Sequence, residues 1–308
     1  MKVLVTGGAG FVGSHIVNKL IDNNIETYVL VSGFRSNKHP CTINKDASIV
    51  KGDLTKYDTL LNATKDIDIV LHVGGIFSHY VDKYPELAID VNIKGTWNLK
   101  KASSINNVNH IIYASSSFVY GDVENIPLHE NSLTEPKDLL GITKLAGEKI
   151  LKLTYLDKID YTILRLFNVY GEYQYPDELY TSVLSTWIKQ SLEKKDLVIH
   201  DDGTQSLDFV YVKDVAEAFI LSINNSASRN EIFNVGSGRS ITMNELARLV
   251  NKITKNERPP IYNPNHPMFL KSIQADIKKI EIMLGWKSKI RIEEGLKNMI
   301  EEMKTRRN

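Results

Sequence analysis

The sequence has little cysteine, no long apolar run and almost no net charge, and each of these absences excludes a class of protein. Cys41 is the single cysteine among 308 residues, which excludes an internal disulfide or a thiolate metal cluster. No stretch approaches the ~20 apolar residues of a membrane span, and the opening MKVLVTGG has too short an apolar run for a signal peptide. The net charge of +1 gives no reason to expect nucleic-acid or membrane binding. We therefore expect a soluble, cytoplasmic protein.

Short apolar segments alternate with amphipathic ones over the first half of the chain. Strands are predicted at 2–6, 26–31, 48–52, 68–73, 110–115 and 161–166, and helices at 11–22, 55–63, 85–105 and 138–157. Most of the strands are apolar on both faces, as strands covered by helices on each side should be. This alternation predicts an α/β fold with a Rossmann-type, doubly wound parallel sheet.

The pattern changes after about residue 170, where polar turns and short strands separate the helices. Helices are predicted at 176–193, 213–224, 242–253 and 293–305. We predict an NAD(P)-binding Rossmann domain over 1–170 that also receives strands near 208–212 and 231–236. A smaller C-terminal α/β substrate-binding lobe over 171–308 would be partly interleaved with the main sheet. The segment 256–267 holds four prolines and is expected to be a surface connection.

A glycine-rich stretch, TGGAGFVGSH, directly follows the first strand and opens the first helix. Gly8, Gly10 and Gly13 satisfy G-x-G-x-x-G, and Gly7, Gly10 and Gly13 satisfy G-x-x-G-x-x-G. Glycine is needed here because the turn is tight and the backbone must approach a pyrophosphate closely. The helix N-terminus then offers N–H groups and a positive dipole end to the phosphates. In this strand–helix context the motif predicts dinucleotide binding rather than a turn without a ligand.

The end of the second strand indicates which dinucleotide is bound. NAD-binding proteins carry an acidic residue about 20 residues after the glycines, whereas Val31 and Ser32 stand there in this sequence. Arg35 and Lys38 follow, and either can neutralise a 2′-phosphate. The cofactor is therefore expected to be NAD(P), with NADP favoured, and the alternative is that Arg35 is a solvated loop charge.

Taken in order, the motifs of the chain resemble those of the extended short-chain dehydrogenase/reductases, in the NAD(P)-dependent sugar-nucleotide epimerase/dehydratase family. Those that carry the resemblance are TGGAGFVG, GDLT, DIVLHVGG, VNIKGTWNL, YASSSFVYG, LRLFNVYG, FVYVKDVAEAF, FNVGSG and LGWKSKIRIEEGL. Together they cover almost the whole chain. The resemblance implies a nucleotide sugar or a related polyol as substrate, and a homodimer built through the helices of 85–105 and 138–157.

The resemblance also implies roles for individual residues. Ser116 and Lys144 would be catalytic, and Ser116, Ser117, Asn168 and His266 would contact substrate. The implied cofactor-binding residues are Gly7, Gly10, Phe11, Val12, Gly13, Ser32, Arg35, Asp53, Leu54, Val73, Gly74, Gly75, Asn92, Lys144 and Phe167.

One catalytic position departs from the family. Members generally use a tyrosine four residues before the lysine, one helical turn away, so that the ammonium lowers the pKa of the phenol. Here that position is Leu140, and none of the fourteen tyrosines has a lysine four residues later. Leucine can neither donate nor accept a proton, and losing a general acid/base typically removes ~10²–10⁴ in rate. Leu140 therefore marks a departure in chemistry rather than ordinary helix packing.

Two arginines that clamp the substrate diphosphate in epimerase-like members are also replaced. Leu207 stands at the first position, in TQSLDFVYV, and His266 marks the second, in NHPMFLKSIQAD. Bidentate arginine–phosphate pairs are strong, so their loss weakens the case for an ordinary nucleotide sugar. His79 and Tyr80, in the loop after strand 68–73, are possible substitutes for the tyrosine, and each is equally a polar loop residue. The scattered histidines predict no metal site.

Three functions remain open. The favoured one is an NAD(P)-dependent epimerase or oxidoreductase with an atypical active site, since Ser116 and Lys144 are both present. The second is a non-catalytic NAD(P)-binding sensor or regulatory pseudoenzyme, which Leu140 favours. The third is a reductase or isomerase that acts on a smaller, non-nucleotide substrate, which the missing arginines favour.

Overall fold

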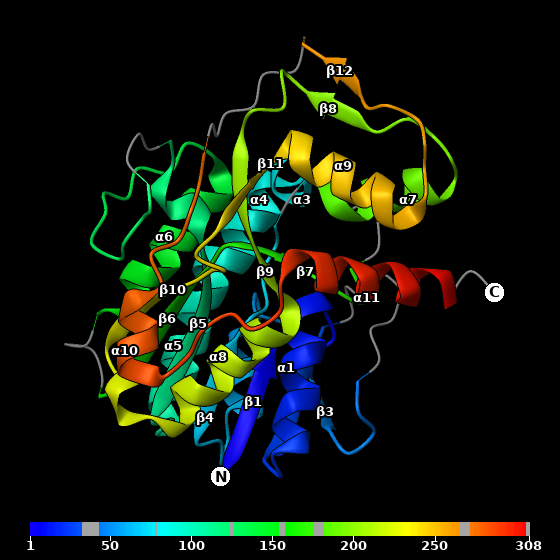
Figure 1. The fold of residues 1–308 in the computed structure, drawn as a ribbon. Coiled ribbons are helices and arrows are strands. Elements are labelled where there is room, and N and C mark those ends of the chain that lie inside the picture. Colours follow the sequence, from blue (N-terminus) through cyan, green and yellow to red (C-terminus); the bar gives the residue numbers. More distant parts are fainter. Residues whose placement is uncertain are drawn as a thin grey trace.

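The centre of the molecule is a seven-stranded parallel sheet with the strand order β10, β6, β5, β4, β1, β2, β3 (Figure 1). The computed structural model describes residues 1–32, 43–77, 79–122, 126–153, 158–174, 182–264 and 272–305. The strands are β1 (Lys2–Thr6), β2 (Glu26–Val31), β3 (Ser48–Lys51), β4 (Ile69–His72), β5 (His110–Ser116), β6 (Asp160–Leu166) and β10 (Glu231–Val235). The Rossmann-type prediction is confirmed.

Helices cover both faces of this sheet. On one face lie α1 (Phe11–Asp22), α8 (Val212–Asn224) and α10 (Lys278–Leu284), and on the other lie α2 (Tyr57–Ala63), α5 (Gly95–Ile105) and α6 (Leu139–Leu151). Strand β1 shows why both faces are apolar. Val3 and Val5 belong to the core under α1 and α8, whereas Leu4 belongs to the core under α2 and α5. Successive strand residues alternate between faces, so a strand buried on both sides needs apolar residues throughout.

The helix predicted over 85–105 is continuous in the structure but contains a π-helical segment. It consists of α4 (Pro85–Ile89), a π-helical turn η1 (Asp90–Lys94) and α5. Pro85 is at the first helical position, where its missing N–H costs no hydrogen bond. The helix predicted over 138–157 is α6, which ends at Leu151. Segments of π-helix are frequent at functional sites, and the one here carries Asn92, a predicted cofactor-binding residue.

The C-terminal lobe has two small sheets and three long helices. One sheet pairs β7 (Asn168–Tyr170), β9 (Ser206–Tyr211) and β11 (Ser240–Thr242), and the other pairs β8 (Val198–His200) with β12 (Ile261–Asn263). The helices are α7 (Val183–Leu192), α9 (Met243–Thr254) and α11 (Ile292–Thr305). Their core includes Trp187 and Leu246 and also takes in Val119 and Tyr120 from the first half of the chain. Strand β12 lies within the segment that was expected to be a plain surface connection.

One strand assignment is wrong. The strand predicted near 208–212 is β9, which pairs with β7 and β11 and does not join the main sheet. The place beside β6 is occupied by β10, the strand predicted near 231–236, so the edge is already paired. Strand β7 follows β6 after a single residue, Phe167, and carries the chain out of the main sheet to pair with β9. The domain boundary near residue 170 stays a prediction.

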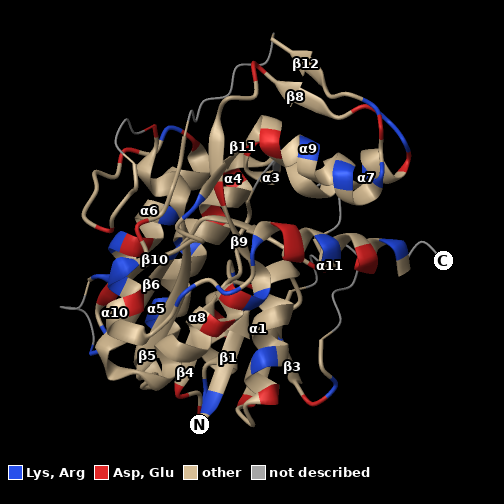
Figure 2. Ribbon diagram, viewed as in Figure 1, with Lys and Arg blue, Asp and Glu red and all other residues tan. Residues whose placement is uncertain are grey.

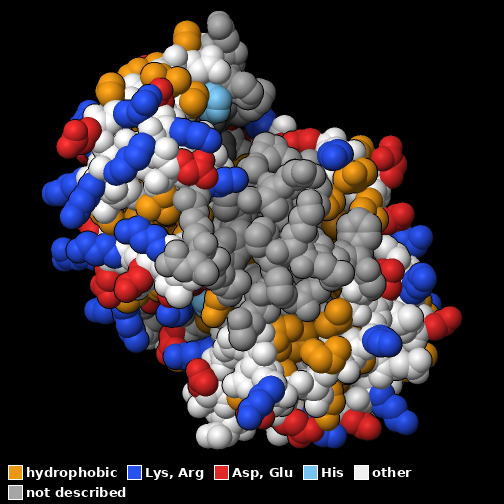
Figure 3. Space-filling view, turned by 90° about the vertical axis from the view of Figure 1, so that its right-hand side faces the viewer, with side chains coloured by type: hydrophobic (Ala, Val, Ile, Leu, Met, Phe, Trp, Pro, Cys, Tyr) orange, Lys and Arg blue, Asp and Glu red, His pale blue; other side chains and the backbone are white. Residues whose placement is uncertain are grey.

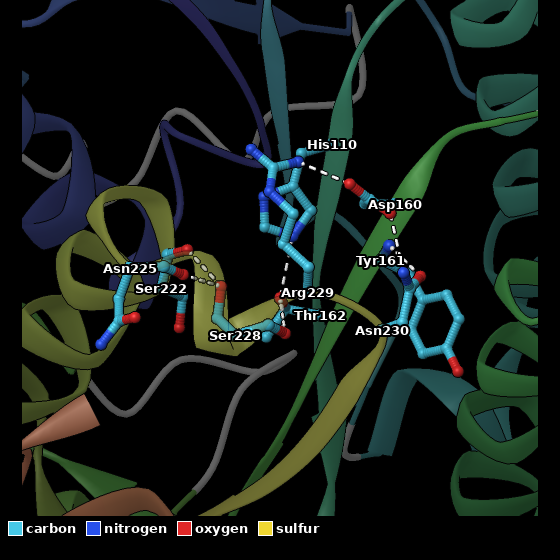
Figure 4. Close-up of polar contacts among 9 residues, drawn as sticks. All are labelled: His110, Asp160, Tyr161, Thr162, Ser222, Asn225, Ser228, Arg229 and Asn230. Carbon is cyan, nitrogen blue, oxygen red and sulfur yellow. Dashed lines mark hydrogen bonds and ion pairs between the residues drawn. The ribbon is translucent and has the colours of Figure 1, made fainter. Parts of the chain in front are cut away.

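Polar side chains close the edge of the sheet formed by the amino ends of its strands (Figure 4). His110 and Thr162, on neighbouring strands, are joined through His110 Nε2 and Thr162 Oγ1 at 2.8 Å. The Thr162 hydroxyl also donates to the Ser228 carbonyl oxygen at 2.7 Å. Asp160 accepts hydrogen bonds from Arg229 at 2.9 Å and from Asn230 at 2.7 Å. We call these six residues the amino-edge cluster; it ties β5, β6 and the start of β10 together.

Charged side chains of both signs lie over the helices and loops of both lobes (Figures 2 and 3). In the described part of the chain, no helix is both long and apolar enough to cross a membrane.

Candidate functional site

A cavity of about 670 Å³ lies at the opposite edge of the sheet, where β1, β4, β5 and β6 end at their carboxyl termini. The lining includes Gly7, Gly10 and Gly13 after β1, Val73, Gly74 and Gly75 after β4, Ser116 at the end of β5, Leu140 and Lys144 of α6, and Phe167 and Asn168 after β6. Ser182, Val183, Leu184 and Phe209 come from the C-terminal lobe. Ligands of doubly wound sheets bind at this edge, and the volume suits a ligand of cofactor size.

The glycine loop has the geometry that a pyrophosphate requires. Gly7 has φ +68°, and a Cβ on it would lie 2.6 Å from Gly74 Cα; a Cβ on Gly13 would lie 2.1 Å from the Gly7 carbonyl oxygen. Gly10 begins α1 without a side-chain cap, so the N–H groups and positive dipole end of the helix are presented to the cavity. The loop therefore has the close backbone packing typical of a dinucleotide phosphate loop, and a side chain at Gly7 or Gly13 would clash with the backbone of Gly74 or Gly7.

Asn92 fixes the loop that forms the floor of the cavity. Its side chain accepts from the Ile76 N–H at 2.7 Å and donates to the Ile76 carbonyl oxygen at 2.8 Å. The same amide group donates to Thr143 Oγ1 at 3.0 Å, which ties this loop to α6. A Cβ on Gly75 would lie 2.9 Å from Asn92 Oδ1 and 3.5 Å from Lys144 Nζ. Asn92 thus acts through the loop: it is not among the residues that line the cavity.

Lys144 is buried beneath the cavity with its ammonium held in a defined position. Its Nζ donates to the Ala114 carbonyl oxygen at 2.8 Å and lies 5.0 Å from the centroid of the Tyr113 ring. Burial lowers the pKa of Lys144 to about 8, because desolvation disfavours the charged form. Among the described lining residues it is the only one with a cationic side chain. Ser116, beside it, accepts a hydrogen bond from the Phe118 N–H at 3.2 Å, which leaves its hydroxyl able to donate.

Behind Ser116, a buried ion pair holds β5, β6 and α6 together. Glu148 accepts from Arg165 at 2.9 and 2.8 Å and from the Ser115 hydroxyl at 2.6 Å. Both side chains of the pair are at most 4% exposed. Such a pair is geometrically specific, so it fixes the position of Ser116 relative to α6.

Leu140 lines the cavity, one helical turn before Lys144. The position where the family has its catalytic tyrosine therefore faces the cavity. Asp138, two residues earlier, also lines the cavity and caps α6 by accepting from the Gly141 N–H at 2.7 Å. A second carboxylate, Asp82 of α3 (His79–Lys83), lines the same cavity. Burial, together with Asp82, raises the pKa of Asp138.

Comparison with known proteins agrees with this arrangement. The model of the NAD dependent epimerase/dehydratase family matches residues 3–236. The chain belongs to this family. The predicted resemblance is therefore confirmed, and with it the assignment of the chain to a family of NAD-dependent enzymes.

Individual relatives of this family match over nearly their whole length. A Methanocaldococcus jannaschii protein, provisionally named a UDP-glucose 4-epimerase, is 37% identical over 307 residues, which are 98% of each chain. The solved structure of UDP-glucose 4-epimerase from Thermotoga maritima with UDP-glucose has a TM-score of 0.93 at 30% identity, covering all of both chains. UDP-glucuronic acid 4-epimerase from Bacillus cereus, in complex with UDP-glucuronic acid and NAD, has a TM-score of 0.90 at 28% identity and 99% coverage of each chain.

Several predicted site residues of this family member lie away from the cavity. Ser117 is buried at the start of η2 (Ser117–Tyr120) and does not line it. Ser32 and Asp53 follow β2 and β3, farther along the carboxyl edge, and the Asp53 carboxylate accepts from Thr55. Leu54, next to Asp53, belongs to the core under α2 and α5. These three positions stay predictions for the adenosine side.

Of the two proposed substitutes for the tyrosine, Tyr80 has a described side chain and His79 does not. Tyr80 is not among the lining residues, and its ring lies 5.5 Å from that of Tyr84. The side chain of His79, like Arg35 and His266, lies outside the described part of the structure. Leu207, at the first arginine position, is buried in the core of the C-terminal lobe.

Sequence reasoning missed the residues that reach the cavity from outside the family motifs. Asp138, Asp82, Phe77, Val81, Gln174 and Ser182 all line it. One signal was available, because an aspartate that precedes a helix is a favoured N-cap and its position at the start of α6 places it beside the missing tyrosine. Asp82 lies in the loop after strand 68–73 that was expected to supply a substitute for the tyrosine, although His79 and Tyr80 were the residues named there.

Proposed function

We propose that this protein is an NAD-dependent UDP-sugar 4-epimerase. The observation that carries the proposal is one cavity in which the glycine loop, Ser116 and Lys144 meet residues of the C-terminal lobe. The Thermotoga and Bacillus structures support the substrate class, because both are 4-epimerases with UDP-sugars.

The residues of the chain divide the work of such a reaction. When bound, NAD would take a hydride from the sugar carbon and return it to the opposite face. Gly7, Gly10 and Gly13 would hold its pyrophosphate, and Lys144 its nicotinamide ribose. Ser116 would orient the reacting hydroxyl, a positional role that a single donor can fill. Asn92 would keep the loop under the nicotinamide in place.

The NADP preference remains a finer proposal. The family is NAD-dependent, so NAD is the cofactor of the proposed reaction. A preference for NADP rests on Ser32, which follows β2 and offers no carboxylate to the ribose hydroxyls of NAD. Tighter binding of NADP than NAD in a fluorescence titration would support it, and tighter binding of NAD would contradict it.

A homodimer and a cytoplasmic location are further proposals. Helices α4, α5 and α6 each leave a large apolar side chain exposed, namely Ile89, Trp97 and Ile142. Light scattering should give twice the chain mass, and Trp97→Lys with Ile142→Lys should give a monomer. The single cysteine, Cys41, favours a reducing compartment.

Proton NMR of the protein with NAD and a panel of UDP-sugars tests the function, because new anomeric signals report the epimer directly. If NAD binds and no sugar is converted, the proposal fails. A non-catalytic sensor, favoured by Leu140, would then be left, or an enzyme for a smaller substrate, favoured by the burial of Leu207.

A further inference from the structure

The cavity retains few groups that can exchange a proton. Of the described residues that line it, Asp82, Asp138, Lys144 and Tyr170 are titratable in the ordinary sense. The Tyr170 hydroxyl donates to the Arg291 carbonyl oxygen at 3.4 Å. Burial raises the pKa of Tyr170 well above its ordinary value, so the phenol does not serve as a base near neutral pH. Lys144 already donates to Ala114, and the proposed function uses it to hold the cofactor ribose. The two carboxylates are left.

We infer that Asp138 is the proton-transfer residue of this active site and takes the place of the family tyrosine. The inference rests on the proposed function. Asp138 is the N-cap of the helix that carries Lys144, two residues before Leu140, and it lines the same cavity as Ser116. A proton acceptor is thus present within one turn of the position that lost it.

The backbone holds Asp138 in place without exhausting its capacity as a base. As the N-cap of α6 it accepts from the Gly141 N–H at 2.7 Å through Oδ1. A carboxylate has lone pairs on both oxygens, so the same group can cap the helix and accept a proton. Serine and asparagine cap helices as well as aspartate, so capping alone gives no reason for an ionisable side chain here.

The surroundings of Asp138 raise its pKa, which is the direction that favours a general base. Burial is the main cause that raises its pKa, and the facing carboxylate of Asp82, on α3, raises it further. The hydrogen bond from Gly141 opposes both. Lys144 is the cation of the same cavity, and the exposed Glu135–Lys137 pair lies on the loop before α6. A general base is most effective when its pKa approaches the working pH.

The step balances within the site. When bound, NAD would accept the hydride of the sugar carbon and later return it to the other face of the resulting 4-ketone. Asp138 would take the proton of the sugar hydroxyl as a carboxylate and, as a carboxylic acid, would give it back to the same oxygen. No net oxidant or reductant is consumed.

Asp138→Asn is the decisive variant, because asparagine keeps the cap and removes the base. With a UDP-sugar that the wild type converts, kcat should fall by about 10²–10⁴-fold, while NAD affinity and the circular dichroism spectrum stay unchanged. Glu135→Gln, an exposed carboxylate outside the cavity lining, is the control that should leave kcat and its pH profile unaltered. Asp82→Asn should shift the acidic limb of the pH profile to lower pH, because it removes the charge that raises the pKa of Asp138.

A second readout needs no substrate. In protein labelled with ¹³C at the aspartate carboxyls, the signal lost in Asp138→Asn should titrate above the usual aspartate range, and should move lower in Asp82→Asn. An active wild type whose Asp138→Asn variant keeps kcat overturns this inference alone. A wild type that converts no UDP-sugar overturns the proposed function and this inference together. A normal Asp138 titration also counts against the assignment.

Discussion

The amino and carboxyl edges of the main sheet carry similar polar residue types in different surroundings. At the amino edge, Asp160, Arg229 and the Nε2 atom of His110 are paired with neighbouring protein groups (Figure 4). At the carboxyl edge, glycines keep the backbone bare, and the charged groups Lys144 and Asp138 line a cavity. The difference teaches that polar groups stabilise the fold where they are paired within the protein, and become available for binding and chemistry where glycine leaves room beside them. Four experiments test this comparison.

The largest effect is expected from the buried ion pair behind the site. Replacing Glu148 by Gln leaves Arg165 buried without its counter-ion, and breaking a buried pair costs about 3–5 kcal/mol. Replacing Arg229 by Gln at the amino edge removes a pair whose side chains are about one-third exposed, and should cost about 1 kcal/mol or less. Urea denaturation measures both free energies of unfolding. Equal losses would remove this contrast between the edges.

The amino edge should make stability depend on pH through His110. Burial, and to a lesser degree Arg229, lowers its pKa from 6.5 to about 4. Between these values the unfolded chain binds a proton that the folded one does not, so stability falls as pH drops from 6.5 to 4, by about 3 kcal/mol for this residue. His110→Gln should lack that part of the pH dependence. His72, whose pKa is also lowered, to about 3, remains in both proteins, so their difference isolates His110.

At the carboxyl edge, Gly13→Ala should damage the phosphate loop. Its Cβ would lie 2.1 Å from the Gly7 carbonyl oxygen, so the loop must move. Overpacking of this kind costs about 1–3 kcal/mol, and we expect NAD affinity to fall by about 10-fold or more in calorimetric titration. Gly10→Ala is the matched variant, because its Cβ would lie 3.2 Å from the same oxygen. It should weaken binding less, and the reverse order would refute the steric account.

The smallest effect is expected from restoring the phenol. Leu140→Tyr places a hydroxyl one helical turn from Lys144 and should raise turnover on a UDP-sugar by about 10-fold, below the range for a full acid/base because Asp138 already serves. Leu140→Phe supplies the ring without the hydroxyl and should give no gain. If both variants gain equally, the effect comes from packing, and if neither does, proton transfer does not limit the rate.

The fold could be predicted because its signals are local. The apolar run of β1 followed by glycines predicts a buried strand and a phosphate loop, and Pro85 and the amphipathic helices mark the elements that follow. The placement of β9 could not be predicted, because either β9 or β10 could pair with the free side of β6. These two strands are far from β6 in the sequence, so no local signal decides between them.

The same distinction applies to the site. Leu140 was recognisable because its position is fixed by Lys144, four residues away on one helix. Asp82 was not, because only the folding of α3 against the start of α6 brings it to the cavity with Asp138. Ser117 was expected from the family resemblance and Tyr80 from the loop after strand 68–73, but neither a motif nor a loop determines which of its adjacent side chains point towards the cavity.

Asp208 of β9 links the sheet of the C-terminal lobe to the main sheet. Its buried carboxylate accepts hydrogen bonds from the N–H groups of Ser237, Gly238 and Ala275 at 2.7–3.0 Å, and its carbonyl oxygen accepts from Asn168 at 3.1 Å. Hydrogen bonds thus fix one residue of the lobe sheet to the turn that follows β10 of the main sheet. The two sheets are therefore joined by a buried carboxylate as well as by the continuity of the chain.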